Sequence, residues 1–206
     1  MDNIVKRAMA KWPNVPHCHG WLALDARGNW RMRNEHAQRQ NLPGEKITQP
    51  ALIGFIQRNY THDAAGRWYF QNGPQRVYVD LEAAPYIART TPSGFMLQTN
   101  ESMGEIENAW LTENGRLFLQ SGERIALLDD RDLAECLDML HKDDAPATES
   151  DLDAWMAFAT TSSKTGDMAN PPLALQLGEK NLPLGFIAEQ NIPARFGFVS
   201  KPRRTD

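Results

Sequence analysis

A polar pattern that occurs twice restricts this chain to a small set of folds. Residues 66–76 read GRWYFQNGPQR, and residues 115–124 read GRLFLQSGER, which is one residue shorter. The polar positions recur, whereas the apolar residues change. Because side chains alternate between the two faces of a strand, Trp68 and Phe70 fall on one face, and the corresponding leucines of the second copy do the same. The pattern predicts a repeated β unit.

Three glycine turns support this interpretation. Segments 25–28, 63–66 and 112–115 read DARG, DAAG and TENG. A short polar side chain at the first position and glycine at the fourth fit a type I turn closed by a left-handed glycine. We therefore expect a positive φ at Gly66 and Gly115, and we expect valine at either position to destabilise the fold.

Apolar periodicity predicts short helices between the strands. A segment near 50–60 begins with proline and is apolar on most sides, and residues 4–12 carry one apolar stripe. Further helices are predicted near 130–141 and 150–159, the latter with a capping box formed by Ser150 and Asp153.

These elements predict an α+β fold of repeated antiparallel β-hairpin and strand units with a few short helices. We expect a first β-rich unit over residues 1–92 and a second, related unit over 93–160. Residues 161–206 are expected to form a loop and an extended C-terminal cover, with a loop over 160–172. The proline-containing segments 181–187 and 191–199 suggest edge strands or extended cover over a core.

Composition indicates a soluble globular protein. The 206 residues are 41% hydrophobic and 23% charged, and the N-terminus resembles neither a signal peptide nor a membrane span. Two cysteines, Cys18 and Cys136, are too few for a disulfide scaffold, so a cytoplasmic location is expected. A net charge of −4 argues against a nucleic-acid partner. The basic residues 201–204 are interpreted as a frayed tail.

Signatures of catalysis are weak. The run His17-Cys18-His19 offers metal ligands, but alternate residues of an extended segment share a face and no second ligand pair stands at zinc-site spacing, so we expect no metal. Nucleophile elbows and phosphate-binding glycine loops are absent, so no cofactor is expected. An enzyme with a non-standard acid/base site at His17, His19 or His62 remains the alternative hypothesis.

The polar face of the repeat is the candidate binding surface. With Trp68, Phe70, Val77, Val79 and Leu81 toward the core, alternation places arginine, tyrosine and glutamine on the opposite face. Arginine and tyrosine are enriched at interaction hot spots. The competing interpretation is an exposed sheet face whose aromatic residues pack under a neighbouring segment. The predicted binding residues are Arg67, Tyr69, Arg76, Tyr78, Arg116 and Arg124.

Four segments resemble a proteobacterial family known as a domain of unknown function: KWPNVPH at 11–17, GWLALD at 20–25, GNWRMR at 28–33 and GRWYFQNGPQRVYV at 66–79. The order of the predicted strands, glycine turns and helix is more distantly similar to another uncharacterised bacterial family. That family has repeated structural motifs and a suggested role in signal transduction. This resemblance implies a regulatory module. We therefore expect a non-enzymatic protein that binds a small anionic ligand or a protein partner on the arginine-bearing face or in a cleft between the units. A homo-oligomer is another expected form.

Overall fold

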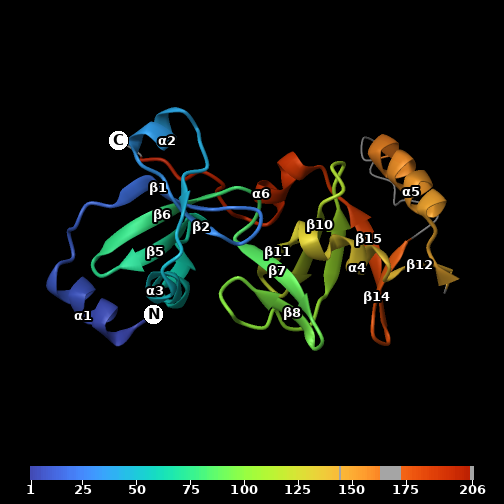
Figure 1. The fold of residues 1–206 in the computed structure, drawn as a ribbon, viewed down its shortest axis with the longest axis horizontal. Coiled ribbons are helices and arrows are strands. Elements are labelled where there is room, and N and C mark those ends of the chain that lie inside the picture. The colour runs from blue at the N-terminus through green and yellow to red at the C-terminus, as the bar shows by residue number, and fades with distance from the viewer. Residues whose placement is uncertain (144, 163–172, 205–206) are drawn as a thin grey trace.

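The computed structural model describes residues 1–143, 145–162 and 173–204. Two curled sheets lie one after the other along the long axis of an elongated molecule (Figure 1). The first, in blue and teal, is built from the N-terminal part of the chain, and the second contains the rest of the strands. Helices and strands are mixed, which confirms the α+β class.

The first sheet has the strand order β3-β2-β1-β6-β5-β4. Strand β1 runs parallel to β6, and the other neighbours are antiparallel. The strands are β1 (Cys18–Leu24), β2 (Trp30–Met32), β3 (Glu45–Lys46), β4 (Tyr60–His62), β5 (Trp68–Asn72) and β6 (Gln75–Leu81).

The second sheet has the order β13-β12-β14-β15-β9-β10-β11-β7-β8. Its segment β8-β7-β11-β10-β9 follows the same order and the same parallel and antiparallel pairings as β2-β1-β6-β5-β4. The strands are β7 (Tyr86–Thr91), β8 (Gly94–Leu97), β9 (Asn108–Leu111), β10 (Leu117–Ser121), β11 (Arg124–Leu128), β12 (Leu140–Lys142), β13 (Ala145–Pro146), β14 (Ala174–Leu177) and β15 (Lys180–Phe186).

The helices lie around the two sheets, with α1 and α5 near opposite ends of the long axis (Figure 1). Helix α3 begins at a proline, as predicted, because proline at the first turn loses no helical hydrogen bond. The helices are α1 (Asn3–Lys11), α2 (Glu35–Arg39), α3 (Pro50–Arg58), η1 (Asp130–Asp132), α4 (Leu133–Leu137), α5 (Glu149–Ser162), η2 (Glu189–Asn191) and α6 (Ile192–Arg195).

Several predicted helix boundaries were wrong. The helix expected near 130–141 ends at Leu137, and Leu140 already begins β12. The capping box of α5 lies two residues earlier than predicted: Thr148 Oγ1 accepts from the Asp151 backbone N–H, and the Thr148 backbone N–H donates to the Asp151 carboxylate. Helix α5 also continues to Ser162, and the remainder of the loop predicted over 160–172 lies outside the described residues.

The three glycine turns have the predicted geometry. Gly66 and Gly115 have φ values of 70° and 72°, and each donates its backbone N–H to the carbonyl three residues earlier. The residue after each glycine accepts from the first turn residue, as in a hairpin with a bulge. The prediction of positive φ is confirmed.

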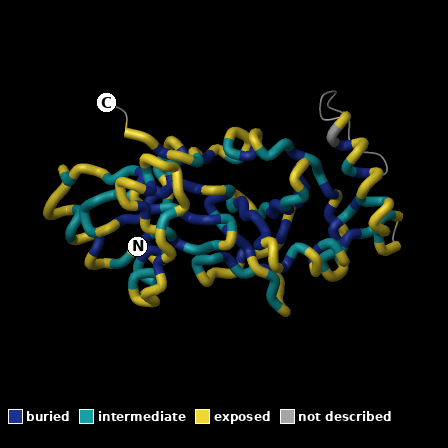
Figure 2. Tube along the Cα trace, turned by 45° about the horizontal axis from the view of Figure 1, so that its top comes forward, coloured by how far each residue is buried: buried dark blue, intermediate teal, exposed yellow. Residues whose placement is uncertain are grey.

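The second sheet separates two apolar cores. On one face, Leu117 and Leu119 pack with Trp155 of α5 and Leu175 of β14. On the other face, Phe118 joins the core built from the first sheet. The tube in Figure 2 is accordingly buried along the middle of both sheets and exposed at the turns. The two sheets are therefore held together by a shared core.

The C-terminal segment is integrated into the fold, contrary to two predictions. Strand β15 pairs with β14 on one side and β9 on the other, so it is not an edge strand. Residues 196–204, called the C-terminal strap below, return to the first sheet, where Phe198 is buried and the Ser200 carbonyl accepts from the Leu81 backbone. The expected frayed tail at 201–204 is therefore wrong, since Arg203 forms an ion pair with Asp80.

Candidate functional site

The candidate site is built on the antiparallel pair β5 and β6. Tyr69 lies opposite Tyr78 in the register, and Phe70 lies opposite Val77. Trp68 and Phe70 are 9% and 5% exposed and belong to the shared core, as alternation predicts. The outer face therefore carries Tyr69 and Tyr78.

The two tyrosines lie under the arginines rather than beside them at the surface. Tyr69 is 6% exposed and Tyr78 is 2% exposed. The Arg76 guanidinium lies 4.7 Å from the Tyr69 ring centre, and that of Arg67 lies 5.2 Å from the Tyr78 ring centre. We expected all four side chains to form the contact surface, but the two tyrosines are not part of it. An arginine guanidinium covers the solvent-facing side of each tyrosine ring. Arg67 and Arg76 remain partly exposed.

Arg67 is fixed by the turn that precedes β5. Its Nε donates to Asp63 Oδ2 over 2.8 Å, and the Tyr78 hydroxyl donates to the same oxygen over 3.1 Å. Burial raises the pKa of Asp63, but the hydrogen bonds from Arg67 and Tyr78 outweigh it, so the net pKa is lowered. Arg67 is thus part of a structural network.

Two histidines extend the same face. His19 stacks on Tyr78 with a centroid distance of 4.6 Å, and His17 approaches the edge of that ring at 5.9 Å. Burial lowers the pKa of His17, and the charges of Arg76 and Arg67 lower it further. The pKa of His19 is lowered by burial first and then by neighbouring positive groups. In both histidines burial is the larger cause of the lowered pKa, and nearby positive charge is the smaller one.

Cys18, between these histidines, lines an apolar pocket on the other side of the sheet, so the three candidate metal ligands do not converge. Within the described ranges, no three His, Cys, Asp or Glu side chains are grouped so as to hold a metal ion. The His62 ring packs against Trp68 at a tilt of 44° and is hydrogen-bonded to the Asp63 carbonyl. Among the residues that the structure describes, no histidine ring is hydrogen-bonded to a carboxylate.

The C-terminal strap adds two arginines, Arg203 and Arg204. Arg203 donates to Asp80 Oδ1 over 2.8 Å, and the buried Arg33 binds the other Asp80 oxygen. Arg203 and Arg204 both lower the pKa of His19. We call the resulting surface the basic face. It consists of His17, His19, Arg67, Arg76, Arg203 and Arg204.

Arg76 and Arg204 are the two arginines of the basic face without an ion pair to a carboxylate in the described residues, and of these Arg76 is held in place by the Tyr69 ring. Arg67 and Arg203 bind Asp63 and Asp80. The sequence offered His17 and His19 only as candidates for acid/base catalysis or metal binding, and it did not place Arg203 or Arg204 on this face. The alternation of His17 and His19 could have predicted that both lie on one face. No local sequence pattern predicts that residue 203 returns to the first sheet.

The charge is distributed unevenly along the chain. Residues 1–92 contain 12 Lys and Arg against 7 Asp and Glu, a net +5, whereas residues 93–160 contain 4 against 15, a net −11. Residues 161–206 carry 6 against 4, a net +2. The basic face therefore lies in the basic part of a protein whose total charge is negative.

The predicted counterparts in the second unit lie elsewhere. Both hairpins have two-residue loops, so the strand pairing aligns Arg124 with Gln75 and not with Arg76. Arg124 binds the Ser102 carbonyl, while Arg116 pairs with Glu189. Neither residue belongs to the basic face.

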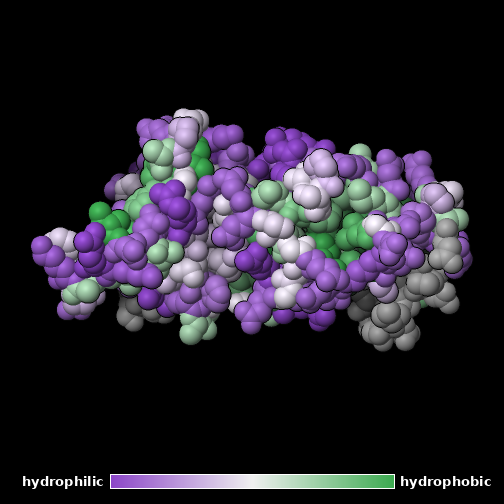
Figure 3. All heavy atoms as spheres, turned by 90° about the horizontal axis from the view of Figure 1, so that it is seen from below, coloured by the Kyte–Doolittle hydropathy of each residue, from purple (hydrophilic) through white to green (hydrophobic). Residues whose placement is uncertain are grey.

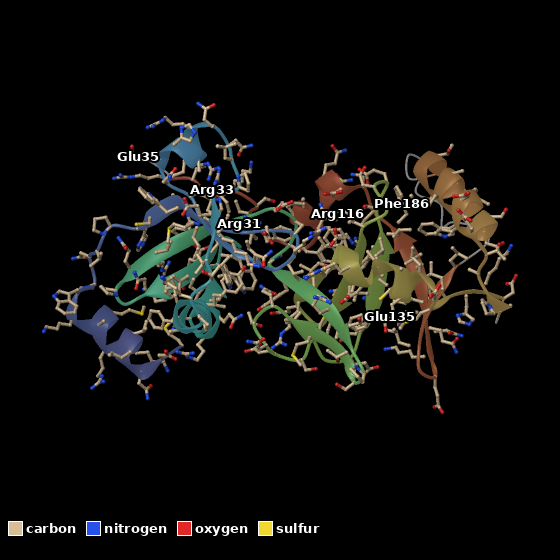
Figure 4. The ribbon with its side chains drawn as sticks, viewed as in Figure 1. Arg31, Arg33, Glu35, Arg116, Glu135 and Phe186 are labelled. Atoms are coloured by element: carbon tan, nitrogen blue, oxygen red, sulfur yellow. The ribbon has the colours of Figure 1, made fainter. Side chains whose placement is uncertain are left out.

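Arg116 instead lines a cleft of about 440 Å³ between the two sheets, which Arg27 and Arg31 also line. Figure 4 shows Arg31 and Arg116 on the two sides of this junction. Arg27 and Arg31 bind Asp130 and Asp25 at 2.7 Å, so the positive charges of the cleft are already paired. The basic face is thus the better candidate for binding an anion.

No helix in the described part of the chain combines the length and the apolar character needed to cross a bilayer. A comparison with curated proteins gave no match. Among solved structures, a DUF1285 family protein from Silicibacter pomeroyi DSS-3 is 15% identical, with 90% of this chain and 96% of that chain covered and a TM-score of 0.49. A DUF1285 family protein from Shewanella baltica OS155 is 12% identical, with 56% and 88% covered and a TM-score of 0.39.

A family model gives the assignment. Residues 1–203 match the DUF2944 model, described as "Protein of unknown function (DUF2946)". The match confirms the expectation of a family of unknown function. Because it spans nearly the whole chain, the protein belongs to the DUF2944 family.

Proposed function

We propose that this protein is a non-enzymatic regulatory module, acting in the cytoplasm, whose basic face binds an anionic group of a small ligand or of a partner protein. The observation that carries the proposal is the position of Arg76, a partly exposed cation without a carboxylate partner in the described residues. Its guanidinium lies over the Tyr69 ring, 4.7 Å from the ring centre, and this contact limits the entropy lost on binding.

The histidines provide a second line of support. Burial is the largest cause of the lowered pKa of both histidines, but nearby positive charge adds to it, from Arg76 and Arg67 at His17, and this positive charge favours a bound anion. An anion placed beside Arg76 would also stabilise protonated His17. Binding should therefore raise the pKa of His17, which NMR can follow.

The test compares Arg76→Gln with Arg39→Gln as a matched control. Arg39 is an exposed arginine of α2 that lies outside the basic face and pairs with Glu35. The probes are pyrophosphate, titrated by calorimetry, and a fluorescent oligoglutamate peptide, followed by anisotropy. We expect Arg76→Gln to weaken binding about fivefold, as for an exposed ion pair, and to raise the pKa of His17 in the free protein.

Arg39→Gln should change neither quantity. If the two variants bind both probes equally well, or if neither probe shifts the titration of His17, the basic face is not an anion site. Unchanged melting temperatures would show that both proteins are folded.

We also propose that the two expected β units are related, with their boundary before Tyr86 rather than after residue 92, because β7 (Tyr86–Thr91) pairs with β8 and β11 of the second sheet. The C-terminal part is more than a cover, since β14 and β15 are strands of the second sheet. The matching strand order and the two positive-φ turn glycines support this relation. An experimental structure tests it. The backbone of residues 63–72 should superpose on that of residues 112–121 with the flanking strands in register, and a different hairpin register would refute it.

A further inference from the structure

A second cavity lies at a distance from the basic face, among the strands of the acidic part of the chain. It has a volume of about 510 Å³ and is bounded by the β7–β8 hairpin, the β14–β15 hairpin and helix α4. Cavities of this size commonly hold small organic ligands. Figure 3, which shows the molecule from below, has a hollowed apolar patch in its right half, ringed by hydrophilic residues.

The walls of this cavity are mainly apolar. Phe95 and Ile106 are 6% and 5% exposed and belong to the second core, and Met139 and Leu177 pack against that core. A ligand that covers Met139 and Leu177, which are partly exposed, gains affinity by removing their apolar surface from water. The occupant therefore needs an apolar body.

The charged groups favour a positive ligand. Lys180, which lines the cavity, is held by the Glu105 carboxylate at 2.7 Å and by the Ile106 carbonyl at 3.0 Å. Glu135 accepts a hydrogen bond from the Thr90 hydroxyl at 2.8 Å and has no cationic partner in the described residues. Figure 4 places Glu135 between the two hairpins. The cavity thus contains one neutralised cation and one carboxylate that lacks a counter-ion.

We propose that this cavity binds an amphipathic cation, in which an apolar chain or ring carries an amine or guanidinium group that pairs with Glu135. The net charge of −11 on residues 93–160 favours the approach of such a ligand and disfavours an anion. This site and its ligand class are independent of the basic face, so each can fail without the other.

Three probes share one apolar body and differ in charge: phenylbutylamine, phenylbutanol and phenylbutyrate. Comparing them separates the contribution of ligand charge to the affinity from that of apolar burial. Calorimetric titration of the full chain should rank the amine first, the alcohol second and the acid last. Because Glu135 is exposed, Glu135→Gln should weaken amine binding about threefold to fivefold, as for an exposed ion pair, and leave alcohol binding unchanged. Leu177→Ala should weaken both, because it removes wall contacts.

Glu107→Gln is the control, since Glu107 is an exposed carboxylate that does not line the cavity. It should bind the amine like the unmodified protein. The proposal is overturned if the acid binds as tightly as the amine, if none of the probes binds, or if folded Glu135→Gln retains full amine affinity. Folding of each variant is checked by circular dichroism.

Discussion

Gly66 and Gly115 allow two effects on stability to be measured separately. One is the strain of a left-handed backbone conformation, and the other is the loss of a close packing contact. The φ values of the two glycines are 70° and 72°, so alanine is strained to a similar degree at both. A Cβ at Gly66 would lie 2.0 Å from the carbonyl oxygen of Gly197, whereas no atom lies within 4 Å of a Cβ at Gly115. Only the first substitution requires the C-terminal strap to move.

The magnitudes follow from these contacts. Left-handed φ costs an alanine about 1 kcal/mol, and this is the full expected loss for Gly115→Ala. In Gly66→Ala the strap must also separate from the turn. Releasing the buried Phe198 costs roughly 2 kcal/mol more. We therefore expect Gly66→Ala to lose about 3 kcal/mol in total.

Urea unfolding monitored by tryptophan fluorescence measures both losses, and hydrogen exchange identifies their origin. The Val199 backbone N–H donates to the Gly66 carbonyl, so its exchange should accelerate in Gly66→Ala and stay slow in Gly115→Ala. Equal destabilisation of the two variants, or a protected Val199 amide in Gly66→Ala, would refute the reasoning.

Three further predictions concern other regions. Thr148→Ala removes the cap of α5 and should lower the unfolding free energy by about 1 kcal/mol in a urea titration; no change would exclude a capping role. Hydrogen bonds from Arg89 lower the pKa of Asp132, so stability should fall as the pH drops through the carboxylate range, and acid titrations should show a smaller fall for Asp132→Asn. Burial raises the pKa of Cys136 to about 12, so at pH ~8 a thiol reagent should modify Cys18 and spare Cys136 until the protein unfolds, as mass spectrometry can show.

Local rules explain what could be predicted. The positive φ of Gly66 follows from four consecutive residues, and the inward direction of Trp68 follows from strand alternation. Helix α3 follows from its apolar run and its initial proline. Helix ends were less accurate, because Thr148 and Ser150 are both suitable caps and packing selected the first.

The candidate site could be predicted only in part. Alternation placed Arg67 and Arg76 on one face, but the same rule could not show that the tyrosines between them would be covered. The shift of Arg124 to another register position depended on the equal lengths of the two hairpin loops.

The glycine turns, the alternating faces of β5 and β6 and the uneven charge could all be predicted from the sequence, because they depend on residues close together or on composition. Tertiary structure alone decided that residues 196–204 cross the first sheet, that Arg203 meets Asp80 across 123 positions and that β15 enters the middle of the second sheet. Those contacts join residues far apart in the sequence. They form only when the two sheets pack around their shared core, and no short segment specifies that packing.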